Sequence, residues 1–291
     1  MFENIIGNNK AKEILANITN PSHAYMFLGT EGIGKFLFAK EFAYKWLCTS
    51  SERPCGKCKA CIQFKGNNNM EFFIIEPEDG SIKVGQIRNF INNVYEKPVE
   101  SYKKIYIIND ADEMTDSAQN ALLKVLEEPP LYVMIILIGS NEQAFLNTIK
   151  SRCVKINIQG LTVEELKQYF EKNQETINEK FLDIYQGSIG KAKKIDGQEN
   201  IYLDLQESIL DIKSIGKVEF VKKCTRDITK DNIKDILEYL NILMFKLGKN
   251  NLKYLEVISK INKAIKQCSF NCNVEMISDN LFLNMYDIIC N

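Results

Sequence analysis

The sequence has no excess of charge of either sign. Among its 291 residues, 37 lysines and arginines balance 38 aspartates and glutamates, which leaves a formal net charge of −1 at pH 7. Proteins that are coated by nucleic acid carry many more basic than acidic residues, because lysine and arginine neutralise the phosphates. We therefore expect any contact between this chain and DNA to be local.

Long apolar runs and a basic leader are also missing. The longest apolar run, Val133–Ile138, is far shorter than the roughly 20 residues that a membrane-spanning helix needs. The N-terminus, Met1-Phe-Glu-Asn, is acidic and lacks the basic and apolar regions of a secretory signal. Together with nine cysteines that we expect to be reduced, these features predict a cytoplasmic protein.

Histidine is almost absent, since His23 is the only one in the sequence. No triad with a serine or cysteine nucleophile can be built around it. A lone histidine before an apolar strand is more typical of a structural residue than of a catalytic one. We therefore assign His23 no chemistry.

Two styles of sequence meet near residue 160. Before this point, apolar runs alternate with amphipathic helical stretches, which predicts a doubly wound α/β domain with a parallel sheet. The runs are almost continuously apolar, as in strands that are covered on both faces. The predicted strands are Tyr25–Leu28, Phe72–Ile75, Ile105–Ile108, Val133–Ile138 and Val154–Ile158, and two of the helices between them are Phe36–Leu47 and Ser117–Leu126.

After residue 160 the apolar spacing is helical throughout. We expect a small helical module at residues 161–205 and a second helical domain at residues 206–291, after an α/β core at residues 1–160. The C-terminal stretch Phe270–Met285 has the same spacing, which favours packing in a core or against another subunit. The predicted helices of this half are Glu164–Phe170, Phe181–Tyr185, Ile201–Ile212, Ile233–Leu247 and Leu252–Cys268.

A glycine-rich segment follows the first predicted strand and precedes a predicted helix. It reads G-x-x-G-x-G-K, the pattern of a loop whose backbone N–H groups surround phosphate oxygens and whose lysine reaches the outer phosphates. The next residue is Phe36, where working ATPases have a Ser or Thr hydroxyl that holds Mg²⁺. The loop is compatible with phosphate binding through its backbone N–H groups and Lys35, whereas metal-assisted hydrolysis is harder because Phe36 offers no oxygen. The predicted phosphate-binding residues are Gly29, Gly32, Gly34 and Lys35.

The acidic motif after the third predicted strand is altered as well. A working site places an Asp there to anchor the Mg²⁺ shell and then a Glu to orient the attacking water. Asn109 is neutral, and Asp110 is one methylene shorter than Glu. If the register is shifted by one, Asp110 takes the metal position but Ala111 stands where the second acid belongs. One function is missing in either register, and Asp112 and Glu113 also fit solvated acids at the end of a strand.

Four cysteines are clustered in one short segment. Thiolates that are two residues apart on a turn converge on one tetrahedral metal, and Pro54 and Gly56 favour such a turn. We predict a structural Zn²⁺ that holds residues 48–61 together and does no chemistry. An iron–sulfur cluster is a minor alternative, and unligated cysteines are a poor explanation for the clustering. The predicted ligands, spaced C-x₆-C-x₂-C-x₂-C, are Cys48, Cys55, Cys58 and Cys61.

An arginine stands just before the last predicted strand, in the segment Ser151-Arg152-Cys153. Taken alone, an arginine beside a strand is usually a surface residue. At the edge of the α/β domain, however, it is placed to enter the active site of a neighbouring subunit. A guanidinium offered there neutralises the charge that develops on a transferred phosphoryl group.

These motifs together resemble the AAA+ subunits of the bacterial DNA polymerase III clamp loader, across essentially the whole chain. The run Gln-Asn-Ala-Leu-Leu-Lys within Ala118–Pro129, combined with Ser-Arg-Cys within Thr148–Cys153, is highly specific to this group. The glycine loop and the four-cysteine insertion also match. Further matches are Ile5–Gly7, Ser22–Tyr25 and Gly187–Ala192.

The resemblance implies an AAA+ P-loop NTPase-like core with a zinc-binding insertion at residues 1–160, a helical lid at 161–205 and an all-α collar at 206–291 that oligomerises. It implies a hetero-pentamer with tau/gamma and delta subunits that loads the sliding clamp onto primer-template DNA. Arg152 is, by this resemblance, an arginine finger that acts in trans on the ATP of the adjacent tau/gamma subunit. Lys191 lies near the usual place of a second sensor arginine, which weakens the case for hydrolysis here.

Three functions compete for this sequence. We expect a non-hydrolysing loader subunit that completes the ATPase site of a neighbour. An ATP-hydrolysing clamp-loader subunit of the tau/gamma type is the alternative, and a zinc-bearing nucleic-acid module that acts alone is a third. Phe36 and Asn109 favour the first over the second. The balanced charge and the lack of a basic stripe disfavour the third.

Overall fold

The computed structural model of the chain describes residues 1–268 and 273–290. They form two compact units, one of Met1–Ile177 with Tyr185–Lys191, the other of Asn178–Ile184 with the chain from Ala192 onward. The predicted lid at residues 161–205 contributes to both units, and the division into three parts stays a prediction. Among the described residues, no helix is long and apolar enough to cross a membrane.

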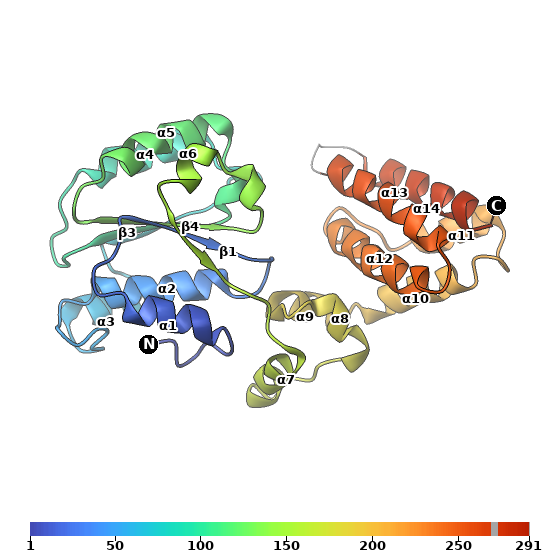
Figure 1. Ribbon diagram of the computed structural model, residues 1–291, viewed down its shortest axis with the longest axis horizontal. Coiled ribbons are helices and arrows are strands. Elements are labelled where there is room, and N and C mark those ends of the chain that lie inside the picture. The colour runs from blue at the N-terminus through green and yellow to red at the C-terminus, as the bar shows by residue number, and fades with distance from the viewer. Residues whose placement is uncertain (269–272, 291) are drawn as a thin grey trace. The chain divides into compact units, whose positions relative to one another are not determined.

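The first unit is built on a five-stranded parallel sheet with the strand order β2-β3-β4-β1-β5 (Figure 1). Because β1 pairs with both β4 and β5, the loop that follows β1 emerges beside the end of β4. The strands are β1 Ala24–Leu28, β2 Phe72–Ile75, β3 Lys104–Ile108, β4 Val133–Gly139 and β5 Val154–Asn157.

The predicted doubly wound α/β core is confirmed, and each predicted strand agrees with the observed one to within one residue at either end. The three central strands are buried at every position. The two edge strands, β2 and β5, are less buried than the prediction of strands covered on both faces implied. In β5 only Ile156 is buried, since an edge strand has a neighbour on one side alone.

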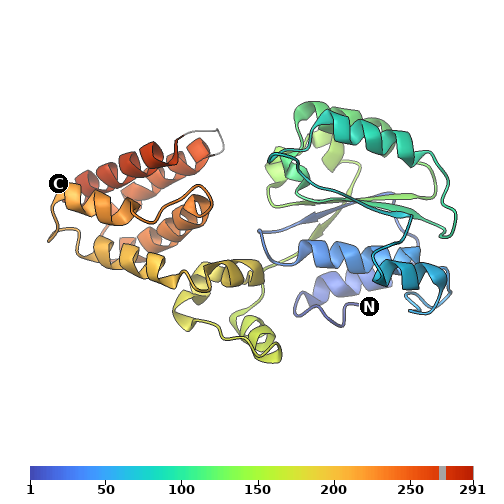
Figure 2. The same ribbon diagram turned by 180° about the vertical axis from the view of Figure 1, so that it is seen from behind.

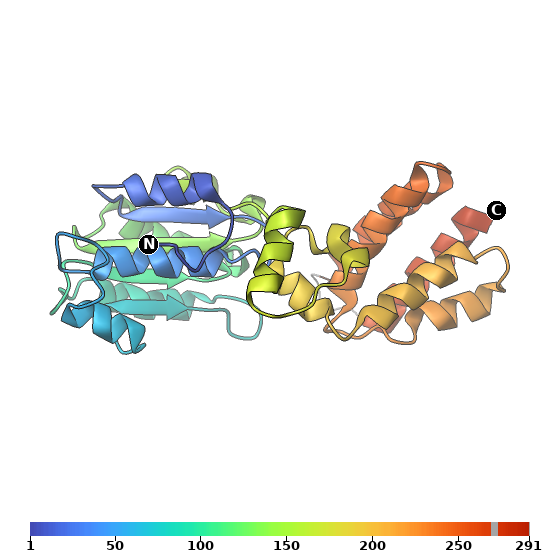
Figure 3. The same cartoon turned by 90° about the horizontal axis from the view of Figure 1, so that it is seen from below.

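Helices cover both faces of this sheet (Figure 1). On one face lie α1, α2 and α3, and Figure 3 shows α1 and α2 running along the direction of the strands. On the other face lie α4, α5 and α6 (Figure 2). The helices and short 3-10 helices between residues 1 and 172 are α1 Asn9–Asn17, α2 Lys35–Leu47, α3 Lys59–Lys65, α4 Val84–Val94, η1 Ala111–Glu113, α5 Asp116–Glu127, η2 Glu142–Ala144, α6 Asn147–Lys150 and α7 Val163–Lys172.

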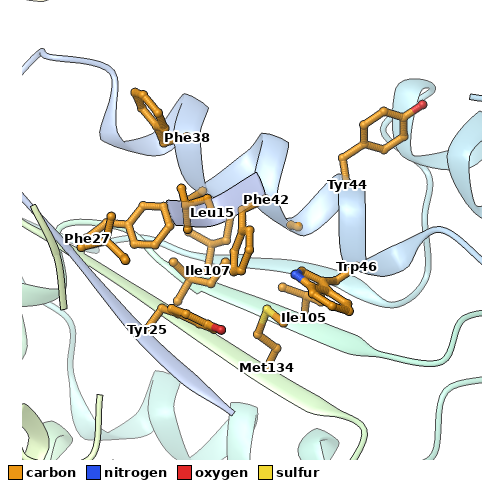
Figure 4. Packing of buried hydrophobic residues seen from close by; sticks show 14 of the residues in the cluster. Leu15, Tyr25, Phe27, Phe38, Phe42, Tyr44, Trp46, Ile105, Ile107 and Met134 are labelled. Atoms are coloured by element: carbon orange, nitrogen blue, oxygen red, sulfur yellow. The ribbon is translucent and has the colours of Figure 1, made fainter. Parts of the chain in front are cut away.

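Aromatic side chains fill the space between α2 and the sheet (Figure 4). Phe42 of α2 meets Tyr25 of β1 edge to face, with ring centroids 4.9 Å apart, a geometry that aromatic pairs prefer. Leu15 brings α1 onto the same cluster. The helix that follows the glycine loop is thereby fixed to the sheet by apolar burial.

The second unit is all-helical, and no described residue after Asn157 belongs to a strand. Edge-to-face aromatic pairs occur in its core, such as Phe220 of α11 with Phe282 of α14, at 6.0 Å. Helix α14 covers most of the predicted stretch Phe270–Met285, whose residues 270–272 lie outside the described ones. The remaining helices of the chain are η3 Glu179–Phe181, α8 Leu182–Tyr185, α9 Ile189–Ile195, α10 Glu199–Leu210, α11 Lys217–Thr225, α12 Ile233–Gly248, α13 Lys253–Cys268 and α14 Val274–Cys290.

Candidate functional site

The glycine loop Gly29–Lys35 joins β1 to α2 at the carboxyl edge of the sheet. Its glycines Gly32 and Gly34 have φ values of 74° and 90°, which only glycine adopts without strain. The loop therefore has the strand–loop–helix setting in which backbone N–H groups at a helix N-terminus bind phosphate.

The amine of Lys35 is held inside this loop. Its Nζ donates hydrogen bonds to the carbonyl oxygens of Gly29 and Thr30, both at 2.8 Å, and to Oγ of Ser140 at 2.9 Å. These three acceptors match the three N–H donors of an ammonium group. Burial lowers the pKa of Lys35, and nearby Asp112 opposes this shift. A phosphate that approached Lys35 would therefore have to displace contacts that the protein itself makes.

Phe36 occupies the first position after the lysine, and its ring packs against the core cluster beneath α2. The side chain that replaces the metal-binding hydroxyl is thus used for apolar packing. It offers no oxygen to a cation.

The acidic residues after β3 are tied into local structure. The amide of Asn109 donates to Oδ2 of Asp110 at 3.1 Å. Burial raises the pKa of Asp110, and Asp112 raises it further. Asp112 accepts the backbone N–H groups of Ser140 at 2.9 Å and Asn141 at 2.8 Å. Asp112 therefore joins the ends of β3 and β4, which favours the structural interpretation of this residue.

A close backbone contact holds the glycine loop against the first turn of α9. The N–H of Gly190 donates to the carbonyl oxygen of Gly32 at 3.0 Å. A Cβ at position 190 would lie 2.8 Å from the Cα of Gly32, and a Cβ at Gly32 would lie 2.4 Å from Oγ of Ser188. Position 190 thus needs glycine because the backbone of Gly32 fills the space of a side chain there, and position 32 needs it because the Ser188 hydroxyl fills that space and φ is positive.

We expect Gly190→Ala to lower the free energy of unfolding by about 1–3 kcal/mol, because overpacked sites shift backbone to make room. Gly85→Ala is the matched control, since Gly85 lies in α4 with nothing within 4 Å of its added Cβ. That change is expected to be neutral or slightly stabilising. Urea unfolding of the two variants tests the contact, and equal midpoints for both would contradict it.

The four clustered cysteines come together as predicted. Their sulfur atoms all lie within 4.8 Å of one another, with Cys55–Cys61 at 4.0 Å and Cys48–Cys58 at 3.9 Å. Four thiolates at the Zn–S distance of about 2.3 Å form a tetrahedron with edges of about 3.8 Å. The spacing therefore fits one metal ion of this kind.

Backbone groups support the same cluster. The N–H groups of Ser50 and Cys55 both donate to Sγ of Cys48 at 3.4 Å, and that of Cys58 donates to Sγ of Cys55 at 3.3 Å. Cys48 directly follows α2, and Cys61 lies in the first turn of α3. Both are buried against the core of the α/β unit. A metal here would join these two helices.

Arg152 lies in the short segment between α6 and β5, far along the chain from the glycine loop and the cysteines. Its Nη1 donates to the carbonyl oxygen of Thr148 at 2.9 Å, and its Nη2 pairs with Oε1 of Glu127 at 2.8 Å. The next residue, Cys153, is partly buried and packs against the core on the α5 face, and burial raises its pKa to about 12. The neutral thiol therefore anchors the backbone while the guanidinium beside it stays partly exposed.

The predicted site residues of the α/β unit fall into three groups: the glycine loop with Lys35, the four cysteines, and Arg152. His23 lies at the amino end of β1, where its carbonyl oxygen accepts from Ile135, at the other end of the strand from the glycine loop. Burial lowers its pKa, in keeping with a structural residue.

Sequence reasoning missed several contacts at these groups. Ser140, Gly190 and Glu127 each contact a predicted residue from elsewhere in the chain. Ser140 had one available signal, because a polar residue directly after a buried strand often lies at the edge where parallel strands end. Gly190 and Glu127 lie in stretches that match the clamp-loader family, Gly187–Ala192 and Ala118–Pro129, but nothing local in the sequence pointed to their contacts.

A sequence model of the family described as DNA polymerase III, delta subunit, matches residues 7–162 of the chain. The chain is 39% identical over 141 residues to DNA polymerase III subunit delta' of Bacillus subtilis, which covers 48% of this chain and 43% of that protein. It is 33% identical over 173 residues to DNA polymerase III subunit tau/gamma of Haemophilus influenzae, covering 58% of this chain and 25% of the relative. The chain thus spans less than half the length of these two relatives.

One solved structure resembles the chain over nearly its whole length. The DNA polymerase III gamma subunit-related protein of Thermotoga maritima has a TM-score of 0.50 and 18% identity, and the match covers 96% of this chain and 98% of that one. At this identity the likeness is one of fold alone.

Proposed function

The chain belongs to the DNA polymerase III delta-subunit family, and on that premise we propose that it is a delta-prime subunit of the clamp loader. In this proposal it assembles in the cytoplasm with tau/gamma and delta subunits into a hetero-pentamer. The complex places the sliding clamp on primer-template DNA during replication. The chain itself does not hydrolyse ATP.

The observation that carries this proposal is that Phe36, directly after Lys35, is a partly buried apolar side chain packed against the core. Metal-assisted phosphoryl transfer needs an oxygen at this position and an acid after β3. Phe36 has no such oxygen, and Asn109 has no charge. Lys35 donates its N–H groups to the loop and to Ser140, so ATP binding is not needed to satisfy it.

Arg152 supports a role in a neighbour's reaction. Its guanidinium is partly exposed at the edge of the α/β unit, and the partly buried Cys153 follows it in the chain. An arginine so placed can enter the ATP site of an adjacent tau/gamma subunit and stabilise the charge that develops on the γ-phosphoryl group. We infer that Arg152 is this arginine finger in trans.

Zinc is the metal that best fits the four cysteines, because four thiolates and a closed tetrahedral set are typical of structural Zn²⁺. Bound there, the ion would supply no chemistry beyond cross-linking. Cys48, Cys55, Cys58 and Cys61 would hold the segment 48–61 against α2 and α3. We also infer a helical lid at 161–205 and a helical collar at 206–291 that binds the other subunits.

The competing function is an ATP-hydrolysing subunit of the tau/gamma type. Retention of Lys35 and the three loop glycines favours it, as does the 33% identity to a tau/gamma subunit. It requires Mg²⁺ to be held without the oxygen that Phe36 lacks.

The two functions differ in the activity of the isolated chain. We expect no Mg²⁺-dependent ATP turnover above background, and no difference between the wild-type chain and Lys35→Ala, because the metal ligands are missing. Phosphate release at saturating ATP measures this, with the cognate tau/gamma subunit as the active control. Steady hydrolysis that disappears in Lys35→Ala would instead support the tau/gamma type.

A further inference from the structure

The contacts of Arg152 are not limited to the preceding helix α6. In addition to the carbonyl oxygen of Thr148, one turn back, it contacts Oε1 of Glu127 at 2.8 Å, from a different helix. A guanidinium has five N–H donors in a fixed plane. In the described part of the chain, the contacts of Arg152 use both N–H groups of Nη1 and one of Nη2. The N–H of Nε and the second N–H of Nη2 are left for an acceptor on another molecule.

Glu127 lies at the C-terminus of α5, where a glutamate does not stabilise the helix. It is the last residue of α5, before Glu128 and the two prolines that end the helix. A negative charge at a helix C-terminus is unfavourable by about 0.3–1 kcal/mol, because the macrodipole is negative there. The stability of α5 therefore does not explain Glu127, whereas its contact with Arg152 gives the charge a partner.

The two elements that carry this pair are fixed to each other by a buried glutamine. Gln119 of α5, only 1% exposed, donates from Nε2 to the carbonyl oxygen of Ala144 at 2.9 Å and accepts the N–H of Leu146 at 2.9 Å. Leu146 directly precedes α6, which leads into Arg152. Because the buried amide would lose these partners if the helices moved apart, the distance from Glu127 to Arg152 is set by the fold.

We propose that Glu127 is a positioning residue that orients the guanidinium of Arg152 toward the neighbouring ATP. This inference rests on the proposed trans role of Arg152. Glu127 and the carbonyl oxygen of Thr148 accept hydrogen bonds from two nitrogens of the guanidinium. The side chain is therefore ordered before the subunits meet. An ordered arginine loses less rotamer freedom when it binds phosphate than a free one does.

The test is the single-turnover rate of ATP hydrolysis in the complex reconstituted with tau/gamma and delta subunits. Glu127→Ala is expected to slow the turnover at the site next to this chain by about three- to tenfold, with KM changed less than about twofold, because the lost ordering affects the transition state. Glu127→Gln, which keeps an acceptor and the side-chain volume, should recover most of the rate. Glu128→Ala is the matched control, one residue along the same helix end, and should behave as wild type.

A double-mutant cycle separates positioning from a structural effect on α5. In the Arg152→Ala background, Glu127→Ala should cause no further loss, since there is no guanidinium left to orient. An additive loss would assign Glu127 to the stability of the helix and overturn the inference. An unchanged or faster rate for Glu127→Ala alone would also overturn it.

The same cycle distinguishes failure of this inference from failure of the proposed function. If Arg152→Ala slows hydrolysis and Glu127→Ala does not, only the positioning role is wrong. If Arg152→Ala itself has no effect, the trans role of Arg152 is wrong, and the positioning role with it.

Discussion

Replacement of Arg152 by alanine is expected to slow hydrolysis at the neighbouring ATPase site by about 10³-fold or more, the scale of effect known for arginine fingers. The partly exposed guanidinium is the one group of this chain that we place against a γ-phosphoryl group. Its loss leaves the developing charge without a partner. The fold of the chain should be unaffected, because the side chain is at the surface and Cys153 stays packed behind it.

The measurement is a single-turnover experiment with the reconstituted complex on primed DNA and clamp. We expect the fast hydrolysis phase to lose the part that arises at the site next to this chain, while assembly measured by gel filtration is unchanged. Arg88→Ala is the control, since Arg88 is an exposed arginine on α4. Full activity of the Arg152→Ala complex would show that the neighbour's site does not use this residue.

Replacement of Cys58 by serine is expected to abolish stoichiometric metal binding. Changes in residues that merely contact a zinc ligand reduce affinity by about 10–100-fold, so removal of a thiolate ligand should exceed that range. The metal's binding free energy, which is about 10–16 kcal/mol in small zinc peptides, is available only to the folded site. The thermal midpoint of the chain should fall as well, because Cys48 and Cys61 join α2 and α3 to the core.

Metal affinity should rise steeply with pH. Burial raises the pKa of Cys48, and burial raises that of Cys61 to about 12, so both thiols carry protons at neutral pH in the metal-free site. For Cys58, burial also raises the pKa, but hydrogen bonds from Thr49 and Cys61 outweigh it and bring the value to about 6. Binding four thiolates at pH 7 therefore releases at least the protons of Cys48 and Cys61, and affinity should increase by about 100-fold or more per pH unit.

Elemental analysis of protein purified without chelator, followed by competition with a chelator between pH 6.5 and 8, checks both expectations. About one zinc per chain is expected for the wild type and for Cys290→Ser, a half-buried cysteine outside the cluster. Wild-type protein that holds iron, or no metal, would contradict the zinc assignment. An affinity that does not change with pH would contradict the proton count.

The strands and the glycine loop were predictable because their signals are local. A buried parallel strand reads as a short apolar run, and Val133–Gly139 is such a run with every residue buried. The spacing of the four cysteines was equally readable, and their sulfur atoms lie within reach of one metal. In these cases a few neighbouring residues carry the whole pattern.

Other elements were missed because their sequences carry weak or mixed signals. None of the predicted helices covers α1, α3 or α11, which have 9, 7 and 9 residues. Helices this short are stabilised mainly by tertiary packing rather than by helix propensity. Leu15, for example, packs α1 into the core and is fully buried. The sequence boundary near residue 160 likewise gave no sign that residues 185–191 return to the first unit.

The sequence by itself determined the α/β class, the loop that ends in Lys35, the cysteine cluster and the loss of an oxygen at position 36. Only the tertiary structure decided what these groups contact. Lys35 meets Ser140, which is 105 residues away, because β1 and β4 are neighbours in the sheet. Arg152 meets Glu127 because α5 and the segment before α6 are linked through Gln119. Composition and spacing show which functional side chains the chain carries. The residues that these side chains contact depend on strand order and helix packing, which no short stretch of sequence specifies.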